Sequence, residues 1–226
     1  MTLRSAYQAM KEPASGLSGE GSTRFEQRET GRLEAFSDGI FAFAITLLVL
    51  GLRDPAQVAG SSLAAGLVQE WPAFFAFITS FLTILIMWVN HHNMFNYIRK
   101  TDTRFMFLNG LLLMTVTLTP FTTMLVGDHI TGNDASTAAE VYSGVFILLA
   151  VTWNFAWRYA SKGHRLLSAN VTDEHVKSVN RDYNFGLALY VVVFALSFVN
   201  GFVGILGILL LGVYWAVTAS LRTLVS

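Results

Sequence analysis

Long apolar runs divide this sequence, and each is long enough to cross a lipid bilayer. A helix needs about 20 mostly apolar residues to cross the hydrocarbon core. The last run, from Tyr183 to Leu221, is too long for one crossing, and Gly201 and Gly204 follow Asn200 near its middle. Because glycines interrupt helices, we expect two helices there, joined by a turn near 199–203. The other expected spans are Leu33–Leu52, Trp71–Tyr97, Phe105–Val126 and Ala138–Tyr159.

The composition agrees with an all-α integral membrane protein of six transmembrane helices. Of the 226 residues, 53% are hydrophobic and 13% are charged, whereas about a quarter of a soluble domain is charged. Equal numbers of basic and acidic residues give no net charge, so nothing indicates a nucleic-acid partner. The chain has no cysteine, which excludes disulfides, thiolate chemistry and cysteine-based metal sites.

The first 30 residues differ in composition from the rest of the chain. They are polar, rich in Gly, Ser and Glu, and lack the apolar core of a signal peptide. We therefore expect a disordered cytoplasmic tail over 1–30, followed by one six-helix transmembrane channel domain over 31–226. A second polar segment, 160–182, is expected to form a short amphipathic or interfacial helix between the fourth and fifth spans.

Basic residues test this division, because Lys and Arg mark the cytoplasmic side of a membrane protein. With six spans, every Lys and Arg except Arg53 falls on one side: before the first span, in the second and fourth loops, and at the C-terminus. The third loop carries Asp128, Asp134 and Glu140 and no basic residue. This alternation predicts that both termini are cytoplasmic.

Asp38 lies inside the first predicted span, where an unpaired charge is costly. One interpretation is that Ser37 and Asp38 cap a helix that begins at Gly39. That helix would be too short to cross the bilayer. We therefore favour a buried Asp38 that accepts hydrogen bonds from donors on neighbouring helices, in a structural role rather than a catalytic one.

Large apolar residues form one stripe along the first predicted helix. At 100° per residue, Phe36, Ile40, Phe43, Leu47 and Leu50 share a face, and Asp38 points nearly opposite. Thr46 lies at the edge of this stripe. One interpretation is a packing seam against another helix of the same subunit. The other is the wall of a narrow pore, where apolar constrictions control wetting.

The second predicted helix ends with two adjacent histidines, His91 and His92. Neighbouring positions on a helix point about 100° apart, so the pair is poorly placed to share a metal ion. We expect one or both to donate a hydrogen bond to a buried acceptor such as Asp38, with Asn109 of the third helix joining them. Proton handling by His and Asp is the next interpretation, and metal binding is third.

Two prolines locate helix features. Trp71-Pro72 is typical of an interfacial anchor followed by a first-turn proline, and Pro120 is expected to kink the third helix.

The chain has no phosphate-binding glycine loop, metalloprotease motif or serine nucleophile motif. The sequence therefore predicts no catalytic residue, metal or cofactor.

The motif Arg32-x-x-x-Phe36-Ser37-Asp38-Gly39 resembles the first helix of the transmembrane protein 175 family of potassium channels. The resemblance continues through Trp71-Pro72, Ser80-Phe81, Trp88-x-Asn90-His91-His92 and Asn109 to Pro120-Phe121, which covers the first three helices. One copy of the motif is present, as in the prokaryotic members. The resemblance implies a homotetramer in a prokaryotic cell membrane, with four copies of the first helix around a central pore.

The resemblance also implies roles for single residues. Phe43, Leu47 and Leu50 match the apolar constriction, where Phe43 stands at a position usually held by Ile or Leu, and Thr46 matches a threonine implicated in ion coordination. The matching structural polar network consists of Arg32, Phe36, Ser37, Asp38, His91 or His92, and Asn109. The function implied is passive conduction of potassium ions. A proton channel, and a small secondary transporter or membrane scaffold, are the alternatives.

Overall fold

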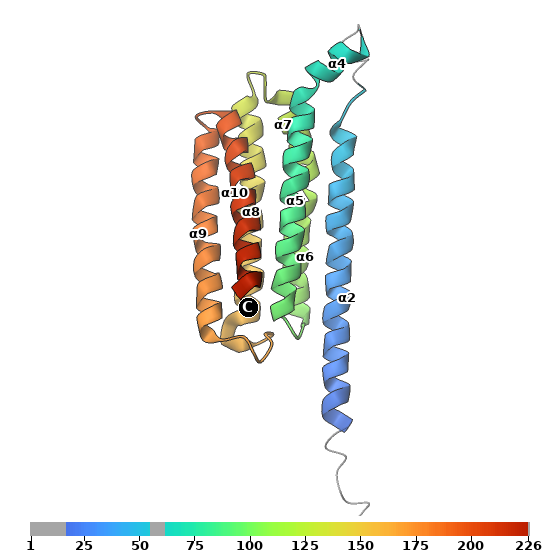
Figure 1. Cartoon of the computed structure of the whole chain (residues 1–226), viewed down its shortest axis with the longest axis vertical. Helices are drawn as coiled ribbons and strands as arrows, with labels where there is room; N and C mark the ends of the chain where they lie inside the picture. Colours follow the sequence, from blue (N-terminus) through green and yellow to red (C-terminus); the bar gives the residue numbers. More distant parts are fainter. Residues whose placement is uncertain (1–16, 55–61, 226) are drawn as a thin grey trace, which may run out of the picture.

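The computed structural model describes residues 17–54 and 62–225, and in that part of the chain nearly every residue is helical (Figure 1). The long helices are α2 (Leu17–Leu47), α5 (Trp71–Tyr97), α6 (Thr103–Thr117), α7 (Thr119–His129), α8 (Ala135–Ser161), α9 (Asp173–Ser197) and α10 (Gly201–Val225). Shorter ones are the 3-10 turns η1 (Leu48–Gly51) and η2 (Lys162–His164), and α4 (Leu63–Gln69).

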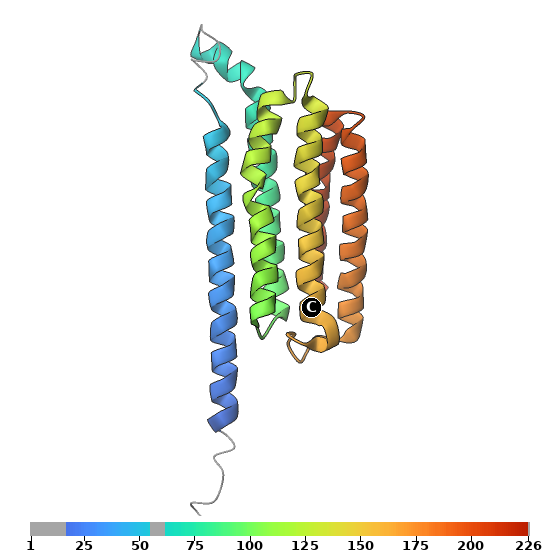
Figure 2. The ribbon, with the colours of Figure 1, turned by 180° about the vertical axis from the view of Figure 1, so that it is seen from behind.

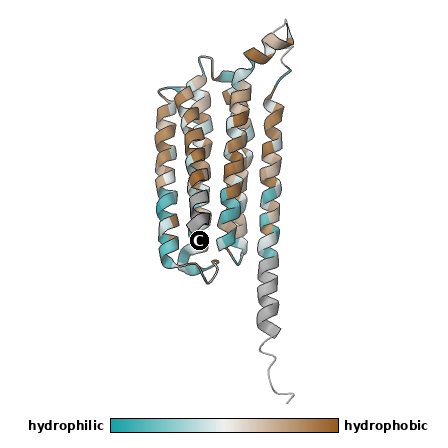
Figure 3. Ribbon diagram, viewed as in Figure 1, coloured by the Kyte–Doolittle hydropathy of each residue, from teal (hydrophilic) through white to brown (hydrophobic). Residues whose placement is uncertain are grey.

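The long helices stand side by side in one bundle, and α2 lies at its edge (Figures 1 and 2). Helix α8 is central, because it contacts α6, α7, α9 and α10. Its fully buried aromatics, Tyr142, Phe146 and Trp157, fill the core. Among the long helices, α2 packs mainly against α5, α6 and α7. The apolar residues concentrate in one band across the bundle, and polar residues gather at the end where α5 finishes and α9 begins (Figure 3).

Five helical segments of the described residues are long and apolar enough to cross a membrane: Glu29–Gly51, Trp71–Tyr97, Thr103–His129, Ala135–His164 and Gly201–Thr218. They include the first four predicted spans and the last. Helix α9 is not among them, because its first half carries charged residues such as Lys177 and Arg181.

The beginnings of two helices differ from the prediction. The fifth helix begins at Asp173 rather than Tyr183, because Thr172 accepts a hydrogen bond from the backbone N–H of His175 (3.2 Å) and caps it. Segment 160–182 is therefore mostly the end of α8, η2 and the start of α9, not an interfacial helix. Helix α2 begins at Leu17, inside the segment 1–30 expected to be disordered, and residues 1–16 lie outside the described residues.

Other sequence predictions are confirmed. Helix α5 has the predicted bounds, with Pro72 in its first turn. The third span is interrupted between α6 and α7, directly before Pro120. Helix α9 ends at Ser197 and α10 begins at Gly201, so the predicted turn is present, slightly earlier than expected.

The polar end of the bundle is tied together around Asp102. Its carboxylate caps α6 by accepting from the backbone N–H of Phe105 (2.8 Å) and also accepts from the hydroxyl of Tyr159 (2.7 Å). Partial burial favours a higher pKa for Asp102, but these two hydrogen bonds and the charge of Arg165 outweigh it and lower the pKa below its ordinary value. Thr30 of α2 joins this end by donating to the carbonyl of Arg99 (3.0 Å).

Gly201 lets α10 begin in direct contact with α8. A Cβ atom at this position would lie 2.6 Å from the carbonyl carbon of Ala135, and backbone cannot move aside cheaply. We expect Gly201→Ala to lower the free energy of unfolding by about 1–3 kcal/mol, the usual cost of overpacking. Thermal unfolding in detergent measures this. The matched control is Gly110→Ala, since no described atom other than those of its adjacent residues and its own helix backbone lies within 4 Å of a Cβ there. An equal loss in both variants would contradict the packing argument.

Candidate functional site

Helix α2 has one face that packs against the bundle and one that does not. Phe41, Ala44 and Leu48 are buried. Phe36, Phe43 and Leu50, three members of the predicted apolar stripe, are 60%, 59% and 69% exposed. The other two members, Ile40 and Leu47, are partly buried at the edge of this exposed face. Phe36, Phe43 and Leu50 therefore form no packing seam against another described helix of the same subunit, whereas Ile40 packs against the buried core.

Thr46 lies on the same exposed face as Phe43. Its hydroxyl donates to the carbonyl oxygen of Phe43 (2.8 Å), which orients the side chain along its own helix. The proton of the hydroxyl is used in that bond, so the oxygen lone pairs remain as acceptors. The exposed face thus combines large apolar side chains with one hydroxyl oxygen, and η1 tightens the helix around Leu50 at its end.

The buried side of α2 is held by a chain of three side chains. Asn109 of α6 donates through Nδ2 to the Ser37 hydroxyl (2.9 Å), and its Oδ1 lies 2.9 Å from Nε2 of His91 on α5. Ser37, Asn109 and His91 are each fully buried. The Ser37 hydroxyl donates in turn to the carbonyl of Leu33. This chain, called here the Ser37 anchor, joins α2 to two neighbouring helices.

Aromatic rings hold the imidazole of His91 in place. The ring of Phe95 stacks on it at 4.6 Å between centroids, Phe41 of α2 lies at 5.2 Å, and Trp153 of α8 approaches edge-on at 6.1 Å. Packing on all these sides fixes the direction in which Nε2 points. His91 therefore serves as a rigid connector between α2, α6 and α8.

The hydrogen-bond partner of Asp38 is Trp88, which the sequence did not predict. Oδ1 of Asp38 accepts from the indole N–H of Trp88 on α5 (2.8 Å), and no hydrogen bond among the described residues joins it to either histidine. His92 instead bonds through Nδ1 to Glu34 (2.8 Å). The expectation that a histidine donates to Asp38 is wrong, because His91 turns inward and His92 outward.

A sequence signal for these two contacts exists. Glu34 and Asp38 are four residues apart on α2, and Trp88 and His92 are four residues apart on α5, so each pair forms one face of its helix. The two helices run in opposite directions (Figure 1), which brings Glu34 to His92 and Asp38 to Trp88. Arg32 and Phe36 are exposed and take no part in these hydrogen bonds.

The two histidines do not converge. His91 is fully buried against Asn109, whereas the His92 side chain is 51% exposed beside Glu34. No group of three His, Cys, Asp or Glu residues in the described part of the chain could hold a metal ion. The arrangement positions a helix rather than a reacting group.

Comparisons with known proteins identify the family. A family model described as the endosomal/lysosomal potassium channel TMEM175 matches residues 32–120. The chain is 43% identical over 197 residues to potassium channel Cha6605_3372 of Chamaesiphon minutus, covering 86% of this chain and 97% of the relative. It is 37% identical over 173 residues to potassium channel B446_29190 of Streptomyces collinus, covering 76% of this chain and 84% of that one.

The mammalian relatives match over a shorter stretch. The human protein named endosomal/lysosomal proton channel TMEM175 is 39% identical over 90 residues, which cover 36% of this chain and 18% of the human one. Among solved structures, the crystal structure of a lysosomal potassium-selective channel TMEM175 homolog from Chamaesiphon minutus matches with a TM-score of 0.76 and 41% identity, covering 85% of this chain and 99% of that chain. The chain belongs to the TMEM175 family.

Proposed function

We propose that this protein is a potassium channel in which four copies of the chain surround a central pore lined by α2. Potassium ions flow passively down their electrochemical gradient, with no cofactor and no catalytic step. Membership of an ion-channel family and the names of the bacterial relatives support this function. The observation that carries the pore assignment is the exposed face of α2 with Phe36, Phe43 and Leu50.

Phe43, Leu47 and Leu50 form the constriction of the proposed pore. The side chains of Phe43 and Leu50 are exposed in the single subunit, and Leu47 is partly buried next to them. Four such helices around one axis would bring these apolar groups together and control wetting of the pore. Thr46, whose hydroxyl oxygen keeps free lone pairs, is the proposed ion-coordinating group.

The proposed topology has six transmembrane helices, with α9 as the fifth of them. Helix α9 runs beside α8 and α10 over their length (Figure 1), which supports counting it with the five apolar spans. The loops after α5 and α8 lie at one end and contain Arg99, Lys100 and Lys162. At the opposite end, Arg53 pairs with Asp128 (2.8 Å). This distribution supports cytoplasmic termini in the cell membrane of a prokaryote.

The Ser37 anchor, with the contacts of Asp38 and Glu34 to α5, holds α2 at a constant angle to the bundle in this proposal. A pore wall made of one helix per subunit needs such support, because no described residue of the same chain covers Phe36, Phe43 and Leu50 on the pore side of α2. Hydrogen bonds between membrane helices contribute about 0.6–2 kcal/mol each. Several of them on one helix therefore fix the constriction.

Proton conduction is the second candidate, and the names of the animal relatives favour it. A relay through Asp38, His91 and His92 is the pathway suggested by the sequence. In the described structure these residues belong to three separate contacts, with Trp88, Asn109 and Glu34. Among the described residues, no hydrogen bond links one contact to the next, so potassium conduction remains the first proposal.

Reconstitution separates the candidates. We expect the purified protein in planar bilayers to carry a current whose reversal potential follows the potassium gradient at equal pH on both sides. A reversal potential that follows only a pH gradient would instead support the proton channel. If the current under both gradients is no larger than in protein-free bilayers, a transporter or membrane scaffold is the remaining candidate. Mass measurement of the detergent-solubilised protein is the companion test, and a mass other than that of a tetramer contradicts the four-copy pore.

A further inference from the structure

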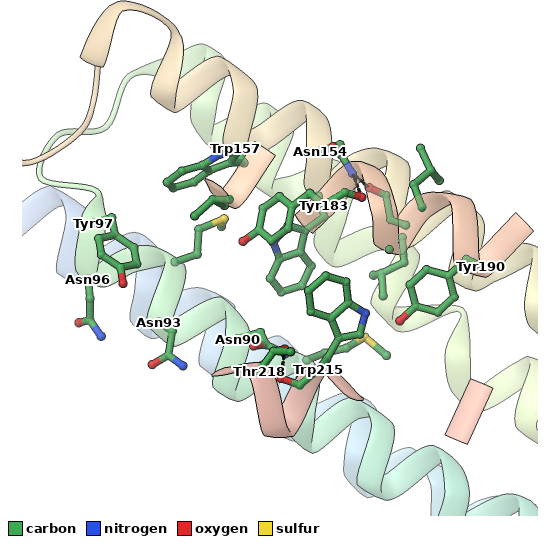
Figure 4. Close-up of a pocket in the computed structure, with 18 residues that line it drawn as sticks. Asn90, Asn93, Asn96, Tyr97, Asn154, Trp157, Tyr183, Tyr190, Trp215 and Thr218 are labelled. Carbon is green, nitrogen blue, oxygen red and sulfur yellow. Dashed lines mark hydrogen bonds between the residues drawn. The ribbon is translucent and has the colours of Figure 1, made fainter. Parts of the chain in front are cut away.

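A cavity of about 300 Å³ lies between α5, α8, α9 and α10, away from α2 (Figure 4). None of its described lining residues belongs to α2, α6 or α7, so it is separate from the proposed pore face. It borders the Ser37 anchor, because Trp153 lines it and lies edge-on to His91. Small-molecule sites have volumes of about 300–1,000 Å³. The cavity is therefore large enough for a compact two-ring molecule.

One wall of the cavity carries side-chain amides inside a membrane span. Asn90 and Asn93 lie one turn apart on α5 and line the cavity (Figure 4). Both are partly exposed, and no hydrogen bond joins either amide to another described residue. Polar groups within spans are costly and usually face a partner or a water-filled cavity. These two amides therefore present donors and acceptors to whatever occupies the space.

The opposite wall is aromatic. Tyr183 of α9 lies edge-on to Trp215 of α10 at 6.2 Å and to Trp157 of α8 at 6.0 Å. Asn154 donates to the carbonyls of Ala150 (2.9 Å) and Tyr183 (3.3 Å), which leaves its own carbonyl oxygen as an acceptor (Figure 4). Flat apolar rings beside such polar groups favour a flat ligand with a polar end.

Two buried donors in the lining lack a partner. The indole N–H groups of Trp153 and Trp157 have no hydrogen bond to any described atom, and these residues are only 9% and 1% exposed. A buried N–H without an acceptor is unfavourable. An oxygen acceptor bound in the cavity would supply one after a small tilt of either ring.

Among the residues whose side chains the structure describes, none that lines the cavity is charged. A charged ligand would leave water without gaining a counter-ion, which disfavours it strongly. We propose that the cavity is a binding site for an uncharged aromatic amphiphile with an amide or carbonyl group, whose ring packs against Trp215 and Tyr183 while its polar end bonds to Asn93.

An isosteric probe series tests the proposal on the full chain in lipid nanodiscs. Indole-3-acetamide is uncharged, tryptamine is a cation and indole-3-acetate is an anion, and all share one ring system. Saturation-transfer NMR, corrected with protein-free nanodiscs, reports binding. We expect indole-3-acetamide to bind about tenfold or more tightly than either charged analogue. A charged group would give up its hydrating water on entering the cavity and would find no counter-ion there.

Variants place the probe in the cavity. Ala150 lines the cavity on α8, and Ala150→Phe is expected to weaken indole-3-acetamide binding about tenfold by filling the space. Leu148→Phe introduces the same residue at a position on α8 that is 51% exposed and outside the lining, so binding should not change. Asn93→Leu is a second, milder variant, and it should weaken binding while the thermal midpoint stays near that of the unmodified protein.

Three outcomes would overturn the proposal. They are no saturation transfer above protein-free nanodiscs, equal affinity for all three probes, and an equal effect of Ala150→Phe and Leu148→Phe. If Ala150→Phe fails to fold, unchanged binding in Asn93→Leu decides against the site. None of these measurements depends on ion conduction, so the binding proposal and the channel proposal can fail separately.

Discussion

Replacement of Asn109 by leucine is expected to lower the free energy of unfolding by about 2–4 kcal/mol, because two buried polar groups lose a partner at once. Asn109 bonds to Ser37 and to Nε2 of His91, and all three side chains are fully buried. The other ring nitrogen of His91, Nδ1, already lacks a partner among the described residues. The imidazole would then be buried without any hydrogen bond found in that part of the structure.

Thermal unfolding in detergent measures this loss, and Thr117→Val is the matched control. Thr117 is also on α6, but it is exposed and bonds only to the carbonyl of Met114 in its own helix. A double-mutant cycle with Ser37→Ala tests the anchor itself. The double variant should lose less stability than the sum of the two single variants. Additive losses, or an Asn109→Leu midpoint equal to that of Thr117→Val, would mean that the anchor does not act as one unit.

Replacement of Phe43 by alanine is expected to raise the potassium current about tenfold or more, which corresponds to a barrier lower by about 1.4 kcal/mol. Four copies of the Phe43 ring at one level of the proposed pore would narrow it and repel water. Alanine removes most of that apolar surface. Because the constriction also excludes hydrated ions, we expect the preference for potassium over sodium to fall in the same variant.

Planar-bilayer recordings with potassium and sodium on opposite sides measure both effects. Phe155→Ala is the matched control, since Phe155 of α8 is 58% exposed and Phe43 is 59% exposed. Phe155 lies outside α2, the helix that lines the proposed pore, so its loss should leave the current unchanged. An unchanged current in Phe43→Ala, or an equal change in both variants, would show that the exposed face of α2 does not line the pore.

Hydropathy predicted the apolar helices well and the polar helix ends poorly. Helix α5 has both predicted bounds, because Trp71 and Tyr97 enclose a continuous apolar segment. The first half of α9 is charged, so a hydropathy argument places its start ten residues too late. The Thr172 cap, followed by Asp173 and Glu174, was a usable signal for the true start.

The sequence named only some members of the candidate site. Arg32 and Phe36 take no part in its hydrogen bonds, and Trp88 and Glu34 were not predicted to belong to it. Ser37, Asn109 and His91 meet as the resemblance implies. The partner of Asp38, however, is Trp88. Successive residues on a helix point about 100° apart, so a small rotation of α5 would exchange Trp88 for a neighbour. Sequence position therefore named the right stretch of α5 but the wrong donor.

The sequence by itself determined that this chain is a multi-pass helical membrane protein with an unusual apolar stripe on its first span. Those properties depend on residue order along one helix at a time, and hydrophobic length and helical period describe them fully. Only the tertiary structure decided that Phe36, Phe43 and Leu50 are exposed and that Trp88 and His92 of α5 support α2. It also decided that a cavity without charged groups in its described lining lies beyond α5. Each of these depends on how helices are rotated and spaced relative to one another, which is set by packing among residues far apart in the chain.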